Sequence, residues 1–240
     1  MRLIQITDCH LLADPQGTSR KGLPLRQLQA VLERVRSLGP DALLVTGDVA
    51  QDETSAAYRH ASRAFASVGC PWFWIPGNHD QPELMEECHP LHEELDLGKW
   101  QVLLLNSRIS GQPGGELGQE QLQRLALQLE ADDRPALIAL HHPPLDIGSV
   151  WMDAIGLKDR DALWQTLSPY PQVKALICGH IHQAFAAWQN VVAVYGCPST
   201  SDQFLPKSHE FAIDEAARPG LRVLELRGET LSTWVERVDL

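Results

Sequence analysis

The sequence is short of basic residues and has no long hydrophobic run at its start. Lys and Arg number 20 against 31 Asp and Glu, which gives a formal net charge of −11. Because affinity for nucleic acid comes largely from Lys and Arg, we expect no nucleic-acid partner. The first apolar run, Leu3–Thr7, falls far short of the roughly 20 residues that a membrane-spanning helix needs. It has no basic region before it and no small-residue cleavage site after it, so we expect no membrane anchor.

Cysteine is also scarce. The five cysteines are odd in number, and their spacing is not that of a disulfide framework. We therefore expect free thiols and a cytoplasmic location. Cys9 and Cys178 stand beside motifs described below, and we interpret them as small buried side chains in preference to metal ligands.

No Pro/Gly/Ser-rich linker, repeat or low-complexity tract divides the 240 residues, so we expect a single domain, residues 1–240. Its first two thirds alternate between short apolar runs and helical patterns, which indicates an α/β fold. The runs that predict buried strands are Leu3–Thr7, Ala42–Thr46, Trp72–Ile75, Val102–Leu105, Ala136–Leu140 and Val173–Cys178.

Three helices are expected between these strands. One has Leu25, Leu28, Leu32 and Val35 on one face and ends at Gly39-Pro40. A second is predicted to begin at a cap on Asp52 and to run to about Val68, and a third carries Leu122, Leu125 and Leu129. After Gly179 the pattern predicts strands joined by turns, with a hairpin at Gln189-Asn190. These strands are Phe185–Trp188, Val191–Tyr195, Phe211–Ile213, Leu221–Leu226 and Leu231–Val238.

Five short polar motifs follow the predicted strands. They are Asp8-Cys9-His10, Gly47-Asp48, Gly77-Asn78-His79-Asp80, His141-His142-Pro143-Pro144 and Gly179-His180-Ile181-His182. Each motif alone is a weak signal, but all five fall at carboxyl ends of strands, where open α/β sheets bind ligands. Together they supply seven candidate metal ligands: Asp8, His10, Asp48, Asn78, His141, His180 and His182.

Oxygen and imidazole ligands of this kind suit a pair of first-row transition metals. Two metals about 3.5–4 Å apart can clamp a phosphoryl group for in-line attack by water. The ligand set therefore predicts a hydrolase of phosphate esters.

In this order and spacing, the five motifs resemble those of the calcineurin-like metallophosphoesterases, from Leu3 to about Glu215. The resemblance implies a four-layer αββα sandwich of two facing mixed β-sheets flanked by helices, with a dinuclear metal centre at one edge. Further stretches resemble the bacterial class III 3′,5′-cyclic-AMP phosphodiesterases. They are Gly47–Asp52, Leu105–Ser107, His141–Leu145, Gly148–Asp153 and Pro198–Phe204.

The resemblance also implies how the metals are held. Asp8, His10, Asp48 and His182 would hold one metal, iron, and Asp48, Asn78, His141 and His180 would hold the other, manganese or iron. Asp48 would bridge the two, since a carboxylate has two oxygens. Neighbours in an extended segment point oppositely, so His142 is expected to turn away from the site. Cys9 departs from the family, which usually has a small hydroxyl residue there, and its thiol suggests sensitivity to oxidation.

The activity implied is hydrolysis of 3′,5′-cyclic AMP to 5′-AMP, which lowers cyclic-AMP signalling. His79 and Asp48 are the candidate catalytic residues. His79 would stabilise the phosphate oxygens or protonate the leaving oxygen, oriented by either Asp52 or Asp80. The candidate substrate-binding residues are His10, Asp48, Asn78, His79 and His182. Trp151 and Phe204 are candidates for packing on the adenine, with ordinary packing an equal alternative.

Two alternatives remain at this stage. The same chemistry could act on another diester, such as a glycerophosphodiester, a 2′,3′-cyclic nucleotide, an aryl diester or a phospholipid pyrophosphate. A catalytically silent binding module is disfavoured, because all seven ligands and His79 are present. Whether the protein is a monomer or a homodimer is left open by the sequence.

Overall fold

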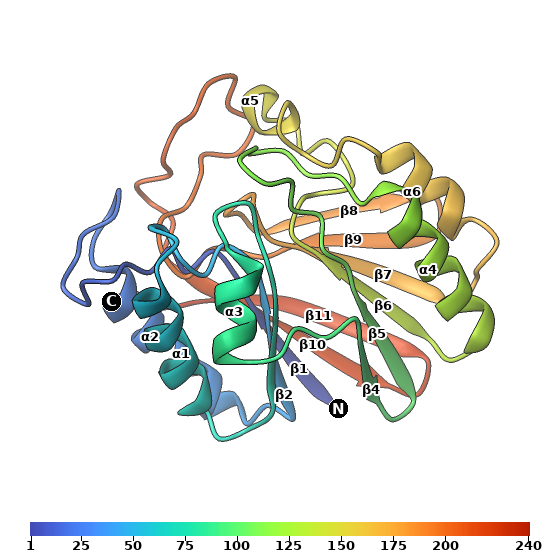
Figure 1. Ribbon diagram of the computed structural model, residues 1–240, viewed down its shortest axis with the longest axis horizontal. Coiled ribbons are helices and arrows are strands. Elements are labelled where there is room, and N and C mark those ends of the chain that lie inside the picture. Colours follow the sequence, from blue (N-terminus) through green and yellow to red (C-terminus); the bar gives the residue numbers. More distant parts are fainter.

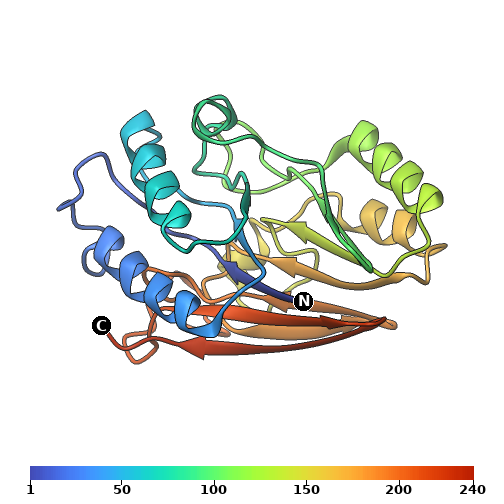
Figure 2. The same ribbon diagram turned by 90° about the horizontal axis from the view of Figure 1, so that it is seen from below.

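Two mixed β-sheets lie face to face with helices on both outer sides in the computed structural model, which describes all of residues 1–240 (Figure 1). Seen from below, helices Pro24–Leu38 and Ser55–Ala66 lie on one side of the sheets, and helices Gly118–Ala131 and Arg160–Leu167 lie on the other (Figure 2). The layers are therefore helix, sheet, sheet and helix, which confirms the predicted αββα sandwich.

The first sheet has five strands in the order β11-β10-β1-β2-β3. Strands β1, β2 and β3 are parallel, while β10 runs antiparallel to β1 and β11 antiparallel to β10. Helices α1, α2 and α3 pack on the outer face. The bounds are β1 Arg2–Ile6, α1 Pro24–Leu38, β2 Ala42–Thr46, α2 Ser55–Ala66, β3 Trp72–Ile75, α3 Pro82–Cys88, β10 Gly220–Arg227 and β11 Thr230–Arg237.

The second sheet has six strands in the order β4-β5-β6-β7-β9-β8. Strands β5, β6, β7 and β9 are parallel, and the two edge strands β4 and β8 are antiparallel to their neighbours. Helices α4, α5 and α6 cover its outer face. The bounds are β4 Glu94–Leu97, β5 Trp100–Leu104, α4 Gly118–Ala131, β6 Ala136–Leu140, α5 Val150–Asp153, α6 Arg160–Leu167, β7 Val173–Cys178, β8 Phe185–Gln189 and β9 Val192–Gly196.

Three apolar cores hold the layers together. Strand residues alternate between two of them, because successive side chains point to opposite faces of a sheet. In β2, Leu43 and Val45 face α1 and α2, whereas Ala42 and Leu44 face the other sheet. The third core lies between the second sheet and α4 to α6. The central strands of both sheets are thus buried on both faces, which explains why they are continuous apolar runs in the sequence.

Several sequence predictions are corrected by the structure. Thr54, not Asp52, caps α2, since the Thr54 hydroxyl accepts a hydrogen bond from the Ala57 N–H at 3.3 Å. Asp52 instead accepts from the Thr54 hydroxyl and from the Ala13 N–H. Phe211–Ile213 forms no strand and contributes only a bridge between Phe204 and Ile213. Strand β4 and helices α3, α5 and α6 are additional elements.

None of the helices combines the length and apolar character needed to cross a membrane.

The edge of the sandwich that matters for function is where β1, β2 and β3 of one sheet and β6 and β7 of the other all end. The loops after these strands are hydrogen-bonded to one another. The Asp8 N–H donates to the Gly47 carbonyl, and the Gly179 N–H donates to the His141 carbonyl. Just beneath them, the Gln5 side chain donates to Thr46 in its own sheet and to the Cys178 carbonyl in the other. The two sheets are therefore held in register directly below the five motifs.

Candidate metal centre

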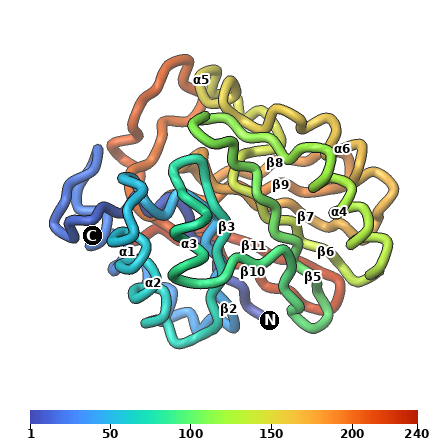
Figure 3. The backbone as a smooth tube through the Cα atoms, viewed as in Figure 1, coloured from blue at the N-terminus to red at the C-terminus, as the bar shows by residue number.

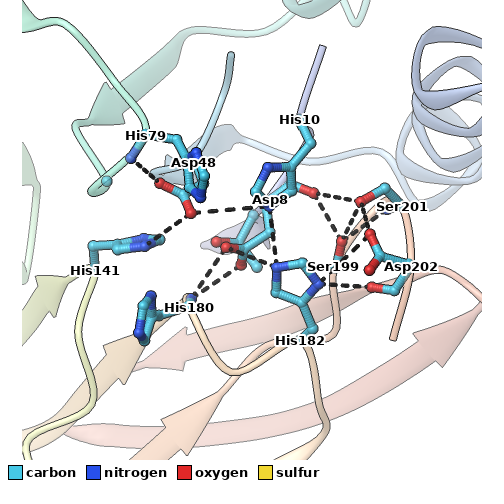
Figure 4. A network of polar contacts seen from close by, with 12 residues as sticks. Asp8, His10, Asp48, His79, His141, His180, His182, Ser199, Ser201 and Asp202 are labelled. Carbon is cyan, nitrogen blue, oxygen red and sulfur yellow. Dashed lines mark hydrogen bonds and ion pairs between the residues drawn. The ribbon is translucent and has the colours of Figure 1, made fainter. Parts of the chain in front are cut away.

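The structure brings all seven candidate ligands together at this edge, and six of the seven are labelled in Figure 4. Asp8, His10 and His182 form one group. The His182 Nε2 atom lies 3.3 Å from Asp8 Oδ1 and 3.1 Å from His10 Nε2. All three residues are buried. One carboxylate and two imidazoles therefore converge on a common point.

A second group lies around His141. Its Nε2 atom is 3.4 Å from Asp48 Oδ2 and 3.2 Å from the Asn78 side-chain oxygen. The His180 ring lies 5.1 Å from the His141 ring, centroid to centroid. The His180 Nε2 atom is buried without any hydrogen-bond partner. A buried nitrogen with a free lone pair is costly, and a metal ion at this position would satisfy it.

Asp48 is shared by the two groups. Its Oδ2 atom lies 3.4 Å from His141 Nε2 and 3.9 Å from His10 Nε2, so the carboxylate stands between them (Figure 4). The donor set therefore fits two cations with one carboxylate in common.

Three of the imidazoles are oriented by hydrogen bonds from behind, each 2.8 Å long. Nδ1 of His141 pairs with the Thr46 carbonyl, and Nδ1 of His182 with the Asp202 carbonyl. Nδ1 of His10 pairs with the side-chain oxygen of Gln51. Because each Nδ1 must carry a proton to donate to oxygen, Nε2 is the nitrogen of each ring that is left to ligate a cation.

The backbone at this edge is strained. Five of the seven candidate ligands have positive φ angles, between 48° and 67°, where residues other than glycine are uncommon. They are Asp8, His10, Asp48, His180 and His182. Such conformations persist only where surrounding structure enforces them, and they gather at functional sites. Here the hydrogen bonds between the motif loops enforce them.

Two glycines allow the loops to approach closely. Gly47 has φ of +96°, and a β-carbon on it would overlap the His141 ring. A β-carbon on Gly77 would overlap the Asp48 carboxylate. The glycine before Asp48 and the one before Asn78 are thus required by packing against the ligands themselves.

The electrostatics of the centre favour cations. Burial lowers the pKa of His10 to about 4 and holds the pKa of His180 well below its usual value, so both are neutral and free to ligate. Burial also acts to lower the pKa of His141, but the Asp48 carboxylate outweighs it and raises that pKa to about 9. In the same way Asp8 outweighs burial at His182 and raises its pKa. Asp48 and Asp8 stabilise a positive charge on the buried imidazole beside each of them. The same carboxylates would stabilise a metal cation at this position.

His142 does not turn away from the centre as the sequence predicts, because one of its ring nitrogens lies within 4.8 Å of ring nitrogens of His141 and His180. Its Nδ1 atom lies 2.8 Å from the Ser107 hydroxyl and its Nε2 atom 3.2 Å from the Pro113 carbonyl, so neither nitrogen is free.

Cys9 is fully buried in the core under α1 and α2, and burial raises the pKa of its thiol. The expected sensitivity of Cys9 to oxidation is therefore unsupported, since the thiolate is the reactive form.

His79 lies at the rim and is held differently from what the sequence suggests. Neither Asp52 nor Asp80 forms a hydrogen bond with its ring. Asp80 is buried and accepts from the N–H groups of Val49, Ala50 and Gly77 and from the Tyr58 hydroxyl. It therefore braces the loops that carry Asp48 and Asn78. The His79 ring instead stands edge-on to the His10 ring at 5.2 Å.

Several supporting residues were missed by reasoning from the sequence. Gln51 orients His10, and the hydroxyls of Ser199 and Ser201 both donate to the Asp8 carbonyl. The only sequence signal for these three residues is that they lie in stretches used for the family resemblance. Phe204, which the sequence predicts as a candidate for packing on the adenine, stacks on His182, with ring centroids 3.9 Å apart.

The sandwich and this centre together define a class of enzyme, the hydrolases that use metal ions to act on phosphate esters. The sequence pattern of the calcineurin-like phosphoesterases matches residues 1–184. The chain therefore belongs to the calcineurin-like phosphoesterase family. Family membership and the His/Asp cluster together support a dinuclear site for divalent metals at this centre.

Similar proteins extend over nearly the whole chain. The 3′,5′-cyclic adenosine monophosphate phosphodiesterase CpdA of Vibrio vulnificus is 39% identical, over 99% of this chain and 90% of its own. The protein of the same name from Escherichia coli K12 is 40% identical over the same shares. A dimetal phosphatase from Danio rerio is 12% identical, covers 100% of this chain and 99% of its own, and superimposes with a TM-score of 0.73. This last likeness concerns the fold alone.

Proposed function

We propose that this protein is a metal-dependent phosphodiesterase that hydrolyses 3′,5′-cyclic AMP to 5′-AMP and so lowers cyclic-AMP signalling. The observation that carries the proposal is the identity of about two residues in five to cyclic-AMP phosphodiesterases, over 99% of the chain. The centre supports it, because a set of donors suited to two cations stands at the edge where the strands end. A cytoplasmic location is part of the proposal, since all five cysteines are free.

Two metal ions would be held by the seven residues named above. Asp8, His10, Asp48 and His182 would hold iron, and Asp48, Asn78, His141 and His180 would hold manganese or iron. When bound, such ions neutralise the phosphate charge and lower the pKa of water toward neutrality. Histidine and carboxylate donors match the preferences of these metals.

The side chains at the rim supply the rest of the reaction. Water attacks phosphorus in line with the 3′-oxygen, so that one P–O bond forms, the bond to the 3′-oxygen breaks and the water releases a proton. His79 is half-buried beside Asp48, where its ring can reach the phosphate and hand a proton to the departing 3′-oxygen. General acid catalysis of this kind contributes about 10²–10⁴-fold. His10, Asp48, Asn78 and His182 line the phosphate position beside it.

The proposal is tested by hydrolysis with purified protein loaded with manganese or iron. The substrates are 3′,5′-cyclic AMP, 3′,5′-cyclic GMP, 2′,3′-cyclic AMP and a glycerophosphodiester, with products separated by chromatography. We expect cyclic AMP to give 5′-AMP and no 3′-AMP, and cyclic GMP to react more slowly. Metal analysis should find close to two ions per chain, and a chelator should abolish activity until manganese or iron is restored. Rapid turnover of another diester with cyclic AMP untouched would overturn the substrate, and absence of both metal and turnover would overturn the enzyme.

A further inference from the structure

A group of three aromatic rings extends outward from the metal centre, and we call it the aromatic rim: Phe204, Trp151 and Phe211. Phe204 lies parallel to the His182 ring, at an interplanar angle of 7°. Trp151 and Phe211 each meet Phe204 edge-on, with centroids 5.2 Å and 5.3 Å away, and meet each other at 5.2 Å. The aromatic rim is therefore continuous with a residue of the metal centre.

Phe204 and Phe211 differ in how much of each ring a ligand could reach. Phe204 is only 6% exposed, with His182 against one face, so its role is packing. Phe211 is 51% exposed, although it lies only one ring beyond Phe204. The exposed part of the Phe211 ring is apolar surface in contact with water. A flat ligand that packs on this ring would remove that surface from water.

The segment that carries Phe211 is held in place. In Figure 3 the tube between β9 and β10 rises next to α5, which carries Trp151. The Leu205 N–H donates to the Ala212 carbonyl at 2.8 Å, and the Asp214 N–H donates to the Gln203 carbonyl at 2.9 Å. These bonds tie the residues that follow Phe211 to Gln203 and Leu205, so they close the base of the loop that carries it.

Arg20 holds the aromatic rim from the opposite loop. Its guanidinium carbon lies 5.7 Å from the ring centroids of both Phe204 and Phe211, and it forms an ion pair with Asp202 at 3.3 Å. Cation–π contacts of this kind add to the fixing of both rings. A site ordered before its ligand arrives loses little conformational entropy on binding.

We propose that Phe211 is the base-binding residue of this enzyme, and that the nucleobase packs on its exposed ring while the phosphate lies at Asp48 and His79. The inference rests on the proposed function and adds the residue that recognises the base. The occupant is a nucleobase, because the aromatic rim begins beside His182 and a nucleotide carries its base one sugar away from its phosphate. Stacking on an aromatic ring tolerates any base, so Phe211 favours nucleotides over base-free diesters and separates adenine from guanine weakly.

The test compares Phe211→Ala with Phe211→Trp and with Trp188→Ala. Trp188 is 64% exposed on edge strand β8 and serves as the matched control for losing an exposed aromatic ring. Each variant is assayed on 3′,5′-cyclic AMP and on the 3′,5′-cyclic phosphate of methyl riboside, which has no base. Product inhibition by 5′-AMP and by ribose 5-phosphate is measured in parallel, because KM alone need not equal a dissociation constant.

We expect Phe211→Ala to raise the KM for cyclic AMP and the inhibition constant of 5′-AMP on the order of 10-fold. Its kcat, its metal content and its kinetics with the two base-free compounds should match the wild type. Phe211→Trp should retain tight binding of the nucleotide, and Trp188→Ala should change nothing.

An unchanged inhibition constant of 5′-AMP in Phe211→Ala, or an equal loss for ribose 5-phosphate, overturns the inference. The wild-type measurements separate this from a wrong substrate. If wild-type protein cleaves cyclic AMP and Phe211→Ala equals it in every constant, only the role of Phe211 is wrong. If wild-type protein leaves cyclic AMP intact, the proposed function and the role of Phe211 are wrong together.

Discussion

The backbone N–H of His79 donates a hydrogen bond to Oδ1 of Asp48 at 2.9 Å. The other oxygen of that carboxylate is the one that faces His141 and His10. Asp48 is therefore held by the loop after β3 while it serves both groups of candidate ligands. The proposed bridging residue and the proposed acid are thus joined by a single hydrogen bond.

We predict that Asp48→Ala removes both metals together, because one oxygen of this carboxylate lies within 4 Å of an imidazole of each group, His10 and His141. His10→Ala, by contrast, should loosen mainly the metal held with Asp8 and His182. Metal content after dialysis, measured for both variants beside the wild type, checks the prediction. Retention of two ions per chain in Asp48→Ala would show that Asp48 does not bridge.

His79→Ala should keep both metals and lose turnover by about 10²-fold or more, as expected when an acid or a charge-stabilising group is removed. The measurement is kcat on 3′,5′-cyclic AMP, whose ribose oxygen is a poor leaving group, together with metal content. His92→Ala is a suitable control, because His92 is exposed and packs edge-on against Phe73 away from the centre. A wild-type rate in His79→Ala excludes the residue from the mechanism.

Gln51→Leu should weaken one metal by about 10–100-fold in affinity, the usual cost of losing the group that orients a ligating histidine. The side-chain oxygen of Gln51 is the acceptor for His10 Nδ1. Gln51→Glu keeps an oxygen at that position and should restore binding. The affinity is measured by competition with a chelator, and equal values for the Leu and Glu variants would refute the role of this hydrogen bond.

Gly77→Ala should destabilise the protein by about 1–3 kcal/mol or more, the usual cost of overpacking, and should also impair metal binding. The added β-carbon overlaps the Asp48 carboxylate and comes within 2.8 Å of the His141 ring. Gly114→Ala is the matched control, because its β-carbon meets neighbouring atoms only at 3.6 Å. Thermal unfolding and metal content of the two variants provide the comparison. Equal stability of the Gly77→Ala and Gly114→Ala variants would mean that the loop carrying Asp48 can move to accommodate the added methyl group.

Much of the fold was readable from the sequence because the central strands are buried on both faces. The observed bounds of β2, β3, β6 and β7 equal the predicted ones, since each strand is a continuous apolar run closed by a motif. Placing the ligands together needed one further fact, that parallel strands bring their carboxyl ends to one edge. The prediction of the candidate site therefore depends on the parallel arrangement of the strands as well as on the types of residue in the motifs.

Other features depend on contacts that a linear pattern does not carry. Strand β4 is an edge strand with alternate residues exposed, so it resembles a polar loop. The sequence predicts Asp52 as the cap of α2, but that carboxylate accepts a hydrogen bond from the Ala13 N–H in the loop after β1. Phe211–Ile213 looked like a strand because it is apolar, yet Phe211 lies in the aromatic rim. In each case the local structure depends on contacts with residues distant in the sequence.

The strained backbone also limits how the metal preference of this enzyme can be redesigned. Asp, Asn and His are several-fold enriched at positive φ among residues other than glycine, and these are the residue types found among the candidate ligands. Introducing a softer thiolate ligand at His10 or His180, or a longer carboxylate at Asp8, asks a less suited residue to adopt the same backbone conformation. The choice of ligand chemistry is thus restricted first by the turn after each strand and only then by the metal. Variants with altered metal selectivity are better sought at Asn78 and His141, whose backbones carry no such constraint.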